Sequence, residues 1–413
     1  MRIVLWHGYL LSGTGSNIYT RALARAWSLA GHEVVVICQD PHPEQFDLAG
    51  ARVVRPDIGG LLPTFILDRY EGLEARYIQD FTDGEWERYV HANVEAVQAE
   101  LPADLVFANH VLPGGAVAAG AGAPFAVKAH GSELEYSMRG RPELVERGRE
   151  ALEDARAIFV GSAHIRQVLE EVVGHVDRVH EVPPGVDVEE FRPEGRAGAL
   201  AGLLDEARRD PANPGNANER QPDEGNAARL EAFFASDEPI VLYFGKLLRN
   251  KGVHLLFEAL RDVDARALVV GFGDHRAELE ALAPPGTLFT GALEHRHLVH
   301  VLPLCDAAVV PSIFPEAFGM VAAEAAASGC PPVVARHSGL AEIAAGLGEA
   351  YGPERAALAS FSTGDAGDLA ARLKELLALP QSERRRLGDL ARQTAVDRWS
   401  WHSVAERLLA PSH

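Results

Sequence analysis

The chain has 413 residues, which at ~150 residues per domain predicts two full domains or one unusually large one. Apolar residues make up 47% and charged residues 24%, as in globular proteins that build sizeable cores. The 39 Lys and Arg against 59 Asp and Glu leave a net charge of -20, which repels nucleic-acid phosphates and anionic lipid. Composition therefore argues against a nucleic-acid binder and allows peripheral membrane contact at most.

Cysteine usage predicts a reducing, cytoplasmic location. Cys38, Cys305 and Cys330 lie far apart and form no CxxC pair, so they fit neither a disulfide framework nor a zinc site. No run of ~18 apolar residues occurs that is able to span a bilayer. The apolar stretch at the start is short and is broken by His7, which favours a first strand over a signal peptide.

The first half alternates short apolar runs with helix-period segments. Several runs are apolar on successive residues, as in parallel strands buried on both faces. Apolar residues that share one face from Ile18 to Ala30 predict a helix that ends before Gly31. The predicted strands are Ile3–Trp6, Val34–Cys38, Leu105–Ala108, Phe125–Lys128, Ile158–Gly161 and Val179–Val182.

A stretch rich in Asn, Pro, Gly, Asp and Glu then interrupts the alternation from about 195 to 238, with a centre near Asp210–Asn216 that looks poorly ordered. Short helices are predicted on either side of that centre, at Ala199–Ala207 and Ala227–Phe234. Strands resume at Ile240–Phe244, Ala267–Val270, Thr287–Thr290, Ala307–Val310 and Pro332–Ala335, and helices follow at Leu373–Leu379, Ser382–Thr394 and from Trp399 to about Leu409.

These patterns predict an α/β protein of two doubly wound domains. The first domain is expected at 1–190 and the second at 191–395, with 191–238 as a linker or insertion. The segment 396–413 is expected to be a terminal helix that crosses back to the first domain.

The most informative stretch runs from Pro311 to Glu324. It lies between the predicted strand Ala307–Val310 and an Ala-rich helix, at the carboxyl end of a parallel strand where doubly wound folds bind ligands. The helix N-terminus near Gly319 suits a diphosphate, and Glu316 and Glu324 would accept hydrogen bonds from sugar hydroxyls on either side of it. For an isolated pair of carboxylates, a surface charge and a helix cap are the favoured interpretation.

The pair is not isolated in the sequence. Glu316 and Glu324 form a Glu-x7-Glu pattern that includes Phe318-Gly319 and is followed by Ala-Ser-Gly-Cys-Pro-Pro-Val-Val-Ala. This pattern resembles the signature of the family 4 glycosyltransferases, which are retaining enzymes of the GT-B architecture. Further matching segments are Gly13-Thr14-Gly15, Pro183–Asp187, Tyr243–Gly252, Gly271–Gly273, Phe289–Leu293 and Trp399–Trp401.

The resemblance implies two Rossmann-like domains that face each other across a cleft, with a nucleotide-diphosphate sugar, UDP- or GDP-sugar above all, held by the second. Lys246 and Lys251 would stabilise the charge that builds on the leaving diphosphate, without a metal ion or other cofactor. The family usually has Arg at the position of Lys246, and Lys lacks the bidentate fork. The implied catalytic residues are His130, Lys246, Lys251 and Glu316, and the implied donor-binding residues are Gly15, Leu293, Phe318, Gly319, Met320, Val321 and Glu324.

Gly15 is expected where a side chain would obstruct a phosphate that approaches the backbone. A dinucleotide fingerprint is the rival interpretation, but the third glycine is missing and the expected acidic residue is Gln39-Asp40 at best. Asp262-Val263-Asp264 mimics a metal-binding DxD but lies away from the other motifs, so no metal site is predicted.

Two histidines follow predicted strands of the first domain. The resemblance places His130 beside the donor sugar and the acceptor, where it donates a hydrogen bond or a proton. His110 holds a similar strand-end position and is a candidate for the acceptor side. The apolar segment Gly60–Tyr70 is compatible with an acceptor-binding lip, a membrane-touching patch or, as we favour, core packing.

The expected partners are the nucleotide sugar and a small-molecule, glycan or glycolipid acceptor bound by loops near 57–80 and 109–145. Without an evident nucleophile, retention implies front-face displacement, in which the leaving phosphate takes the proton of the acceptor. The alternatives are a non-catalytic sugar-nucleotide-binding protein, a GT-B epimerase or phosphorylase, and a dehydrogenase. The sequence does not specify the sugar, the acceptor or the oligomeric state.

Overall fold

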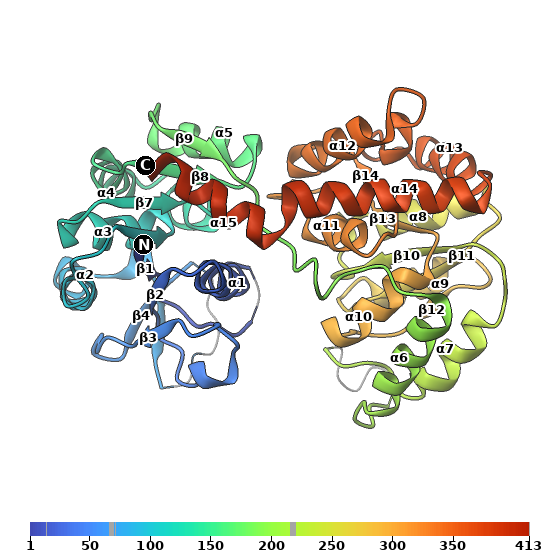
Figure 1. Ribbon diagram of the computed structural model, residues 1–413, viewed down its shortest axis with the longest axis horizontal. Coiled ribbons are helices and arrows are strands. Elements are labelled where there is room, and N and C mark those ends of the chain that lie inside the picture. Colours follow the sequence, from blue (N-terminus) through green and yellow to red (C-terminus); the bar gives the residue numbers. More distant parts are fainter. Residues whose placement is uncertain (14, 66–69, 71, 215–219, 413) are drawn as a thin grey trace. The chain divides into compact units, whose positions relative to one another are not determined.

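The computed structural model describes residues 1–413 except 14, 66–69, 71, 215–219 and 413 (Figure 1). The chain forms two compact units. The first unit comprises Met1–Gly185 and Trp401–His413, and the second comprises Val186–Ser400. Thr14 of the glycine loop, part of the apolar segment after Gly60, and the end of the Asn- and Pro-rich stretch lie outside the described residues.

The first unit is built on a seven-stranded sheet whose strands are all parallel, in the order β3-β2-β1-β6-β7-β8-β9. Every strand predicted in this half is present, within one residue of its expected bounds. The strands are β1 (Arg2–Trp6), β2 (Glu33–Ile37), β3 (Arg52–Val54), β6 (Leu105–Asn109), β7 (Phe125–Lys128), β8 (Ala157–Val160) and β9 (Val179–Glu181).

Alternation along β1 shows why its apolar run is continuous. Ile3 and Leu5 enter one core, on the face covered by Leu23 and Trp27 of the first helix, whereas Val4 and Trp6 enter a second core on the opposite face. Because helices cover both faces of the sheet, both sets of alternate positions must be apolar. The helices of this unit are α1 (Ser16–Leu29), α2 (Asp83–Gln98), α3 (Ala116–Ala121), α4 (Pro142–Glu153), α5 (Ala163–Val173) and α15 (Trp401–Leu409).

Two short strands missed by the sequence analysis form a separate parallel pair, β4 (Leu61–Thr64) and β5 (Glu74–Tyr77). Leu62 is fully buried, and Phe65 packs against the core that also holds Trp86 of α2. The described part of the apolar segment after Gly60 therefore contributes to the core, the interpretation we favoured.

The second unit contains a six-stranded parallel sheet in the order β12-β11-β10-β13-β14-β15. The predicted strands are again present within one residue, and only the two-residue β15 was missed. They are β10 (Ile240–Phe244), β11 (Arg266–Val270), β12 (Leu288–Phe289), β13 (Ala307–Val310), β14 (Pro332–Ala335) and β15 (Ser360–Phe361).

Helices surround this sheet and share one continuous apolar core with it. Helix α13 begins at Ala366, before the expected Leu373, because Asp365 caps it by accepting a hydrogen bond from the Asp368 N–H. The helices are α6 (Arg196–Arg208), α7 (Asn226–Phe234), α8 (Val253–Leu260), α9 (Arg276–Leu282), α10 (His295–Val301), α11 (Met320–Ala327), α12 (Ser338–Tyr351), α13 (Ala366–Leu377) and α14 (Gln381–Thr394).

The stretch expected to be a linker or insertion is largely part of the second unit. Leu203 of α6 and Leu230 of α7 are fully buried in its core. Around the centre, Asn213 is buried and donates from its side chain to the Pro222 carbonyl. The segment was predicted to be a linker because the apolar residues of α6 and α7 lie near many Asn, Pro and acidic residues.

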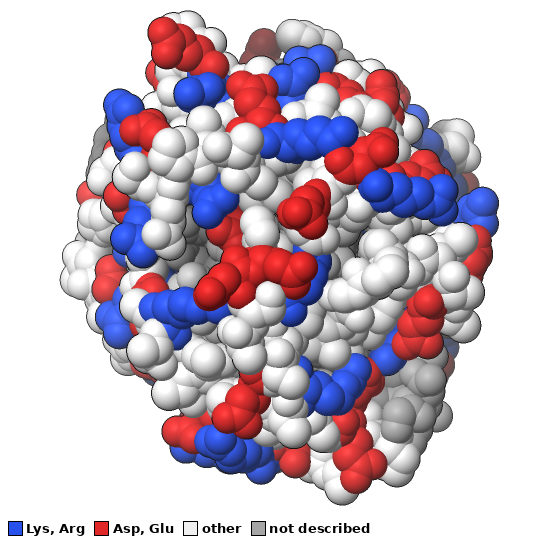
Figure 2. Space-filling model, turned by 90° about the vertical axis from the view of Figure 1, so that its right-hand side faces the viewer, with Lys and Arg blue, Asp and Glu red and all other residues white. Residues whose placement is uncertain are grey.

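The two tryptophans near the end of the chain belong to different units. Trp399 ends a π-helical turn (Ala395–Trp399) and packs edge-on against Phe318, whereas Trp401 begins α15 and packs against Tyr19. The final helix thus begins at Trp401 and not at 396, because extended Ser400 bridges to Val186. On the face shown in Figure 2, Lys and Arg side chains lie interspersed with Asp and Glu. No helix in the described ranges is long and apolar enough to cross a membrane.

Helix α15 is held to the first unit by apolar burial and one hydrogen bond. Val404 and Leu408 are fully buried, and the Trp27 indole Nε1 donates to the Ala405 carbonyl at 3.1 Å. We predict that Leu408→Ala lowers the free energy of unfolding of the first unit by about 2–5 kcal/mol, through lost burial and the cavity left behind. Urea denaturation followed by circular dichroism measures the change.

The matched control on the same helix is Glu406→Ala, whose side chain is 69% exposed and forms an i,i+4 pair with His402. It should change stability by less than about 0.5 kcal/mol. Equal effects of the two substitutions would show that α15 does not support the first unit.

Candidate functional site

Both sheets have a point where the chain reverses the direction in which it adds strands. In the first unit the chain passes from β1 to β2 and β3 on one side and later adds β6 on the other. In the second unit the same reversal lies between β10 and β13. Open α/β sheets bind ligands outside the carboxyl ends of the strands at such a reversal. The candidate residues that follow these strands therefore lie at the two expected binding positions.

The loops after β10 and β13 in the second unit are joined by side chains and by backbone. Lys251 Nζ lies 2.5 Å from Glu316 Oε1, and both side chains are about three-quarters buried. The Ile313 N–H donates to the Asn250 carbonyl at 2.9 Å. The structure thus brings together one of the two predicted phosphate-binding lysines and the carboxylate predicted for the hexose.

Lys246 lies in the same loop but is exposed. The buried Tyr243 hydroxyl donates to its carbonyl at 2.7 Å and fixes the backbone of the turn. Burial, together with the nearby Glu316 carboxylate, raises the pKa of Tyr243, so this hydroxyl keeps its proton. The described residues provide no hydrogen-bond or ion-pair partner for the Lys246 ammonium, which leaves it available to a ligand.

Helix α11 begins where the glycine of the motif permits a sharp turn. Gly319 has φ of 118°, and a Cβ there would lie 2.6 Å from Leu340 Cδ2. The first intrahelical donors are Ala322 and Ala323, which both bond to the Gly319 carbonyl. The N–H groups of Met320 and Val321 precede these donors, so the helix itself provides them no acceptor.

The side chain of Phe318, a predicted donor-binding residue, is unavailable to a ligand. The ring is buried and packs against Trp399 with centroids 6.0 Å apart, so only the backbone of Phe318 is available. The ring therefore anchors the motif to the core of the second unit.

The turn after β14 supports Glu316, and the sequence analysis missed it. The Glu316 N–H donates to Ser338 Oγ, and its carbonyl accepts from the Gly339 N–H, both at 2.9 Å. His337 Nε2 donates to the Ser312 carbonyl at 2.7 Å. The strand-end rule used for Glu316 would have identified this turn, because His337 follows the next parallel strand along the sheet.

Glu324 differs from Glu316 in its electrostatic environment. It is only 8% exposed, and His295 Nε2 lies 3.8 Å from Glu324 Oε1. Burial, with a smaller contribution from the charge of Glu190, raises the pKa of Glu324 to about 8. Glu324 is thus a buried carboxyl that holds a proton at neutral pH.

The expected base-binding position, Leu293, follows the end of β12 and is partly buried against the core. The stretch 221–223, part of the expected linker, pairs with this strand end through Ala292 N–H to the Gln221 carbonyl at 3.2 Å. Asp223 is bound by the Arg276 guanidinium at 2.6 and 2.9 Å. These partners lie more than fifty residues apart in the chain, so no local sequence signal could have identified them.

In the first unit, the glycine loop precedes α1. Gly15 has φ of 63°, and a Cβ there would meet no atom within 4 Å, so the space beside it is open. Asn17 of the same helix lies beside His7, which follows β1, with Asn17 Oδ1 2.9 Å from His7 Nε2. Burial, and then the charge of His110, lowers the pKa of His7 to about 3.

His110 and His130 lie side by side at the ends of β6 and β7, with ring centroids 4.6 Å apart. His110 has φ of 69°, a conformation that non-glycine residues adopt rarely and mostly at functional sites. Glu133, which the sequence analysis did not single out, is fully buried beside them, and its carboxylate accepts the Val111 and His130 N–H groups. The predicted donor-side and acceptor-side histidines are thus neighbours.

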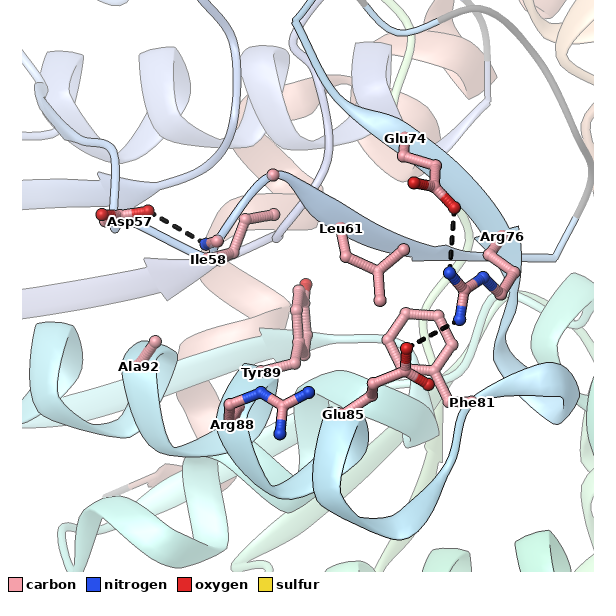
Figure 3. A pocket seen from close by; sticks show the side chains of 12 residues that line it. Asp57, Ile58, Leu61, Glu74, Arg76, Phe81, Glu85, Arg88, Tyr89 and Ala92 are labelled. Atoms are coloured by element: carbon pink, nitrogen blue, oxygen red, sulfur yellow. Dashed lines mark hydrogen bonds and ion pairs between the residues drawn. The ribbon is translucent and has the colours of Figure 1, made fainter.

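A hollow of the first unit, about 560 Å³, lies between the β4–β5 pair and α2 (Figure 3). Arg76 reaches from β5 to Glu85 of α2 at 2.8 Å, and it also bonds Glu74 at 2.9 Å. Arg88 and Tyr89 of α2 line the same hollow. Its volume is within the ~300–1,000 Å³ that small-molecule sites occupy, and it coincides with the loops near 57–80 expected on the acceptor side.

The raised pKa of Glu324 predicts a pH-dependent stability. An unfolded Glu loses its proton near pH ~4.3, whereas folded Glu324 holds it to about pH 8. Between these values the folded state binds more protons, so its stability falls as pH rises, by at most about 1.4 kcal/mol per pH unit. Glu324→Gln removes this dependence, so the variant should gain stability over the natural chain from about pH 5 to about pH 8.

Urea unfolding of the second unit at several pH values measures the difference. Glu349→Gln, which alters a carboxylate that is 69% exposed, is the matched control and should follow the natural chain. Parallel stability curves for Glu324→Gln and the natural chain would refute the predicted protonation of Glu324.

Comparisons with known proteins match both units. The family model described as "Glycosyl transferase 4-like domain" matches residues 14–185, and the family model described as "Glycosyl transferases group 1" matches residues 227–394. The chain is 26% identical to the MMP alpha-(1->4)-mannosyltransferase of Mycolicibacterium hassiacum, over 96% of this chain and 93% of that protein. It is 31% identical to the D-inositol 3-phosphate glycosyltransferase of Xylanimonas cellulosilytica, over 44% of this chain and 41% of that protein.

Solved structures agree in fold. Sucrose-phosphate synthase from Thermosynechococcus elongatus matches with a TM-score of 0.62 and 22% identity, over 98% of this chain and 97% of that one. HepE from Anabaena in complex with UDP matches with a TM-score of 0.69 and 16% identity, over 99% of both chains. The resemblance seen in the sequence is thereby confirmed: the chain belongs to the family 4 glycosyltransferases of GT-B fold.

Proposed function

We propose that this glycosyltransferase is a retaining hexosyltransferase that uses a nucleotide-diphosphate sugar. The observation that carries the proposal is the cluster at the β10–β13 reversal. There, Lys251 contacts Glu316, Lys246 is unpartnered among the described residues, and the α11 N-terminus follows directly. Cations and free N–H groups on one side of a carboxylate suit a ligand that joins a diphosphate to a sugar.

The leaving diphosphate is the group that needs the cations. When the glycosidic bond breaks, negative charge builds on the distal phosphate, and fixed positive groups stabilise that charge more in the transition state than in the ground state. Lys246, Lys251 and the N–H groups of Met320 and Val321 would supply this stabilisation. The mechanism we propose therefore requires no metal ion or other cofactor.

The two carboxyl groups have different proposed tasks. Glu316, ionised beside Lys251, would accept hydrogen bonds from hexose hydroxyls, and the diphosphate would take over part of the contact with the lysine. Glu324 lies buried one turn inside α11, where a hydroxyl of the nucleoside ribose would satisfy it. A buried carboxyl that holds a proton suits a neutral partner that bears hydroxyl groups.

The donor is proposed to be a UDP- or GDP-sugar. HepE was solved with UDP and with UDP-glucose, which supports a nucleotide sugar for this fold but does not assign the base in this chain. Backbone contacts near Leu293 would hold the base. The stretch 221–223, whose Asp223 is bound by Arg276, pairs with the end of β12 just before Leu293.

The first unit is proposed to contribute Gly15, where open space would admit a phosphate, and His130 beside the reacting sugar. The acceptor, a small molecule, glycan or glycolipid hydroxyl, would bind near His110 and extend toward the hollow lined by Arg76 and Arg88. The three cysteines are buried and unbridged, which supports a cytoplasmic location.

Retention is proposed to follow from front-face displacement. The bond from the anomeric carbon to the phosphate oxygen breaks, the acceptor oxygen bonds to the same face, and the leaving phosphate takes the acceptor proton. A product with the anomeric configuration of the donor, measured by proton NMR, supports this course. Inversion, or a covalent glycosyl-enzyme trapped on a carboxylate, would contradict it.

Thermal-shift and hydrolysis assays with UDP-, GDP- and ADP-hexoses test the proposed donor class. We expect one nucleotide sugar to raise the melting temperature through preferential binding to the folded state and to be turned over slowly with water as acceptor. A chain that binds a nucleotide sugar but never cleaves it would be a non-catalytic binding protein.

Substitution of the ion pair tests which residues act on the donor. Lys251→Met should lower kcat for hydrolysis or transfer by about 10²–10³-fold, because one fixed cation at the leaving group is lost. Glu316→Gln should lower the rate while the nucleoside diphosphate still binds, because its proposed partner is the hexose. Lys374→Met, on the exposed surface of α13, is the matched control and should leave the rate unchanged.

A further inference from the structure

The stretch 221–223, which the sequence placed in a linker, adds an antiparallel edge to the sheet of the second unit. Pro222 forms a β-bridge with Gly291, just beyond the end of β12. Next to this bridge, the Asp223 N–H donates to the Thr290 carbonyl at 2.8 Å. Because β12 is the outermost strand of its sheet, the stretch covers the edge of the sheet at the carboxyl end of this strand, where open α/β sheets bind ligands.

Buried polar side chains hold the stretch in this place. The Asp223 carboxylate accepts two hydrogen bonds from the Arg276 guanidinium, at 2.6 and 2.9 Å, and both side chains are about nine-tenths buried. Arg229 of α7 donates to the Phe289 carbonyl of β12 at 2.6 Å. A bidentate pair between Arg and a carboxylate fixes both distance and orientation, so the stretch has a defined position on the sheet edge.

A glycine on the strand side makes this close approach possible. Gly291 has φ of 72°, in the left-handed region that side chains rarely adopt. A Cβ at this position would lie 2.7 Å from Asp223 Oδ1 and 2.7 Å from the Gln221 carbonyl oxygen. The stretch and the strand end are thus in contact through their backbones, with no side chain between them.

The contact between Glu324 and His295 indicates which end of the proposed donor lies near this edge. His295 begins α10 two residues after Leu293, and its Nε2 lies 3.8 Å from Glu324 Oε1. The proposed donor has its hexose at Glu316 and its ribose at Glu324, so its base continues past Glu324, away from the hexose. The residues that follow β12 are therefore the ones that the nucleoside end of the donor meets.

Gln221 is the polar side chain that the stretch brings to these residues. Its carbonyl accepts the Ala292 N–H, which places Gln221 opposite Ala292, the residue before Leu293. Side chains opposite each other in an antiparallel pair have Cβ atoms ~4.5–5.5 Å apart. The Gln221 side chain is partly exposed, and its amide has no hydrogen-bond partner among the described residues. An amide offers a donor and an acceptor side by side.

We propose that the side-chain amide of Gln221 hydrogen-bonds the nucleobase of the donor, so that the stretch 221–223 forms one wall of the base-binding position. The inference rests on the proposed function for the nucleotide donor. Uracil and guanine each present an N–H beside a carbonyl oxygen, whereas adenine presents an amino group beside a ring nitrogen that accepts. The amide of Gln221 matches the first pattern in one orientation and the second when it is turned over.

Calorimetric titration of the full chain with UDP, GDP, ADP and inorganic pyrophosphate tests the contact. Gln221→Ala should weaken the nucleoside diphosphate that the natural chain binds best by about 3–10-fold, because a hydrogen bond to the base is lost. Pyrophosphate, which has no base, should bind both chains equally. Gln381→Ala, at the exposed start of α14, is the matched control and should change none of these affinities. Urea unfolding should give the same stability for both variants and the natural chain.

Gln221→Glu tests the base itself. A carboxylate cannot donate to a base carbonyl but still accepts from the adenine amino group, so the affinity for UDP and GDP relative to ADP should fall about tenfold. This ratio cancels the effect of the added charge on the shared diphosphate. An unchanged ratio, or a Gln221→Ala variant that binds every ligand as the natural chain does, would overturn the proposal. Failure of the proposed function differs, because the natural chain would then bind no nucleoside diphosphate.

Discussion

The position of the central strand in each sheet decides where the reactive side chains of this protein lie. Because crossover connections leave β1 and β10 in opposite directions, the carboxyl ends of β1 and β6, and of β10 and β13, are left without a covering connection between them. The chain places its polar residues at these ends: His7 and His110 in the first unit, Lys251 and Glu316 in the second. Most other strand positions are buried apolar residues, so these ends are where charged groups can be reached without unfolding a core.

Three glutamates show how environment separates residues of one type. Glu133 is fully buried but accepts two backbone N–H groups and one imidazole, so its charge is satisfied and its task is to hold neighbouring groups. Glu316 is paired with Lys251, which fits a carboxylate that exchanges its partner when a ligand enters. Glu324 lacks a close cation, and burial raises its pKa to about 8. Desolvation is the larger cause in the last case, and the charge of Glu190 acts in the same direction.

The sequence was sufficient for most of the strands and for the proximity of the second-unit candidate residues, because both depend on local patterns. Continuous apolar runs specify strands buried on two faces, and Glu316, Gly319 and Glu324 lie within nine residues of one another. It was insufficient where the partner is distant or the element is short. The Asp223–Arg276 clamp joins an apparent linker to α9, and the two-residue β15 has no periodicity to detect. The division of Trp399 and Trp401 between two units depends on the partners Phe318 and Tyr19, which no local pattern names.

The same limit applies to the chemistry of the histidines. A histidine after a strand can be recognised from sequence, but whether it donates or accepts is decided by the atom that faces its other nitrogen. For His130 that decision passes through Asn109 to Thr20 and ends at a backbone carbonyl of α1, which can only accept. The orientation of the Asn109 amide is thus anchored in the helical backbone of α1 through Thr20, two residues removed from His130 along the hydrogen-bond chain. The hydrogen-bonding character of a strand-end histidine therefore depends on residues that lie behind it in the fold.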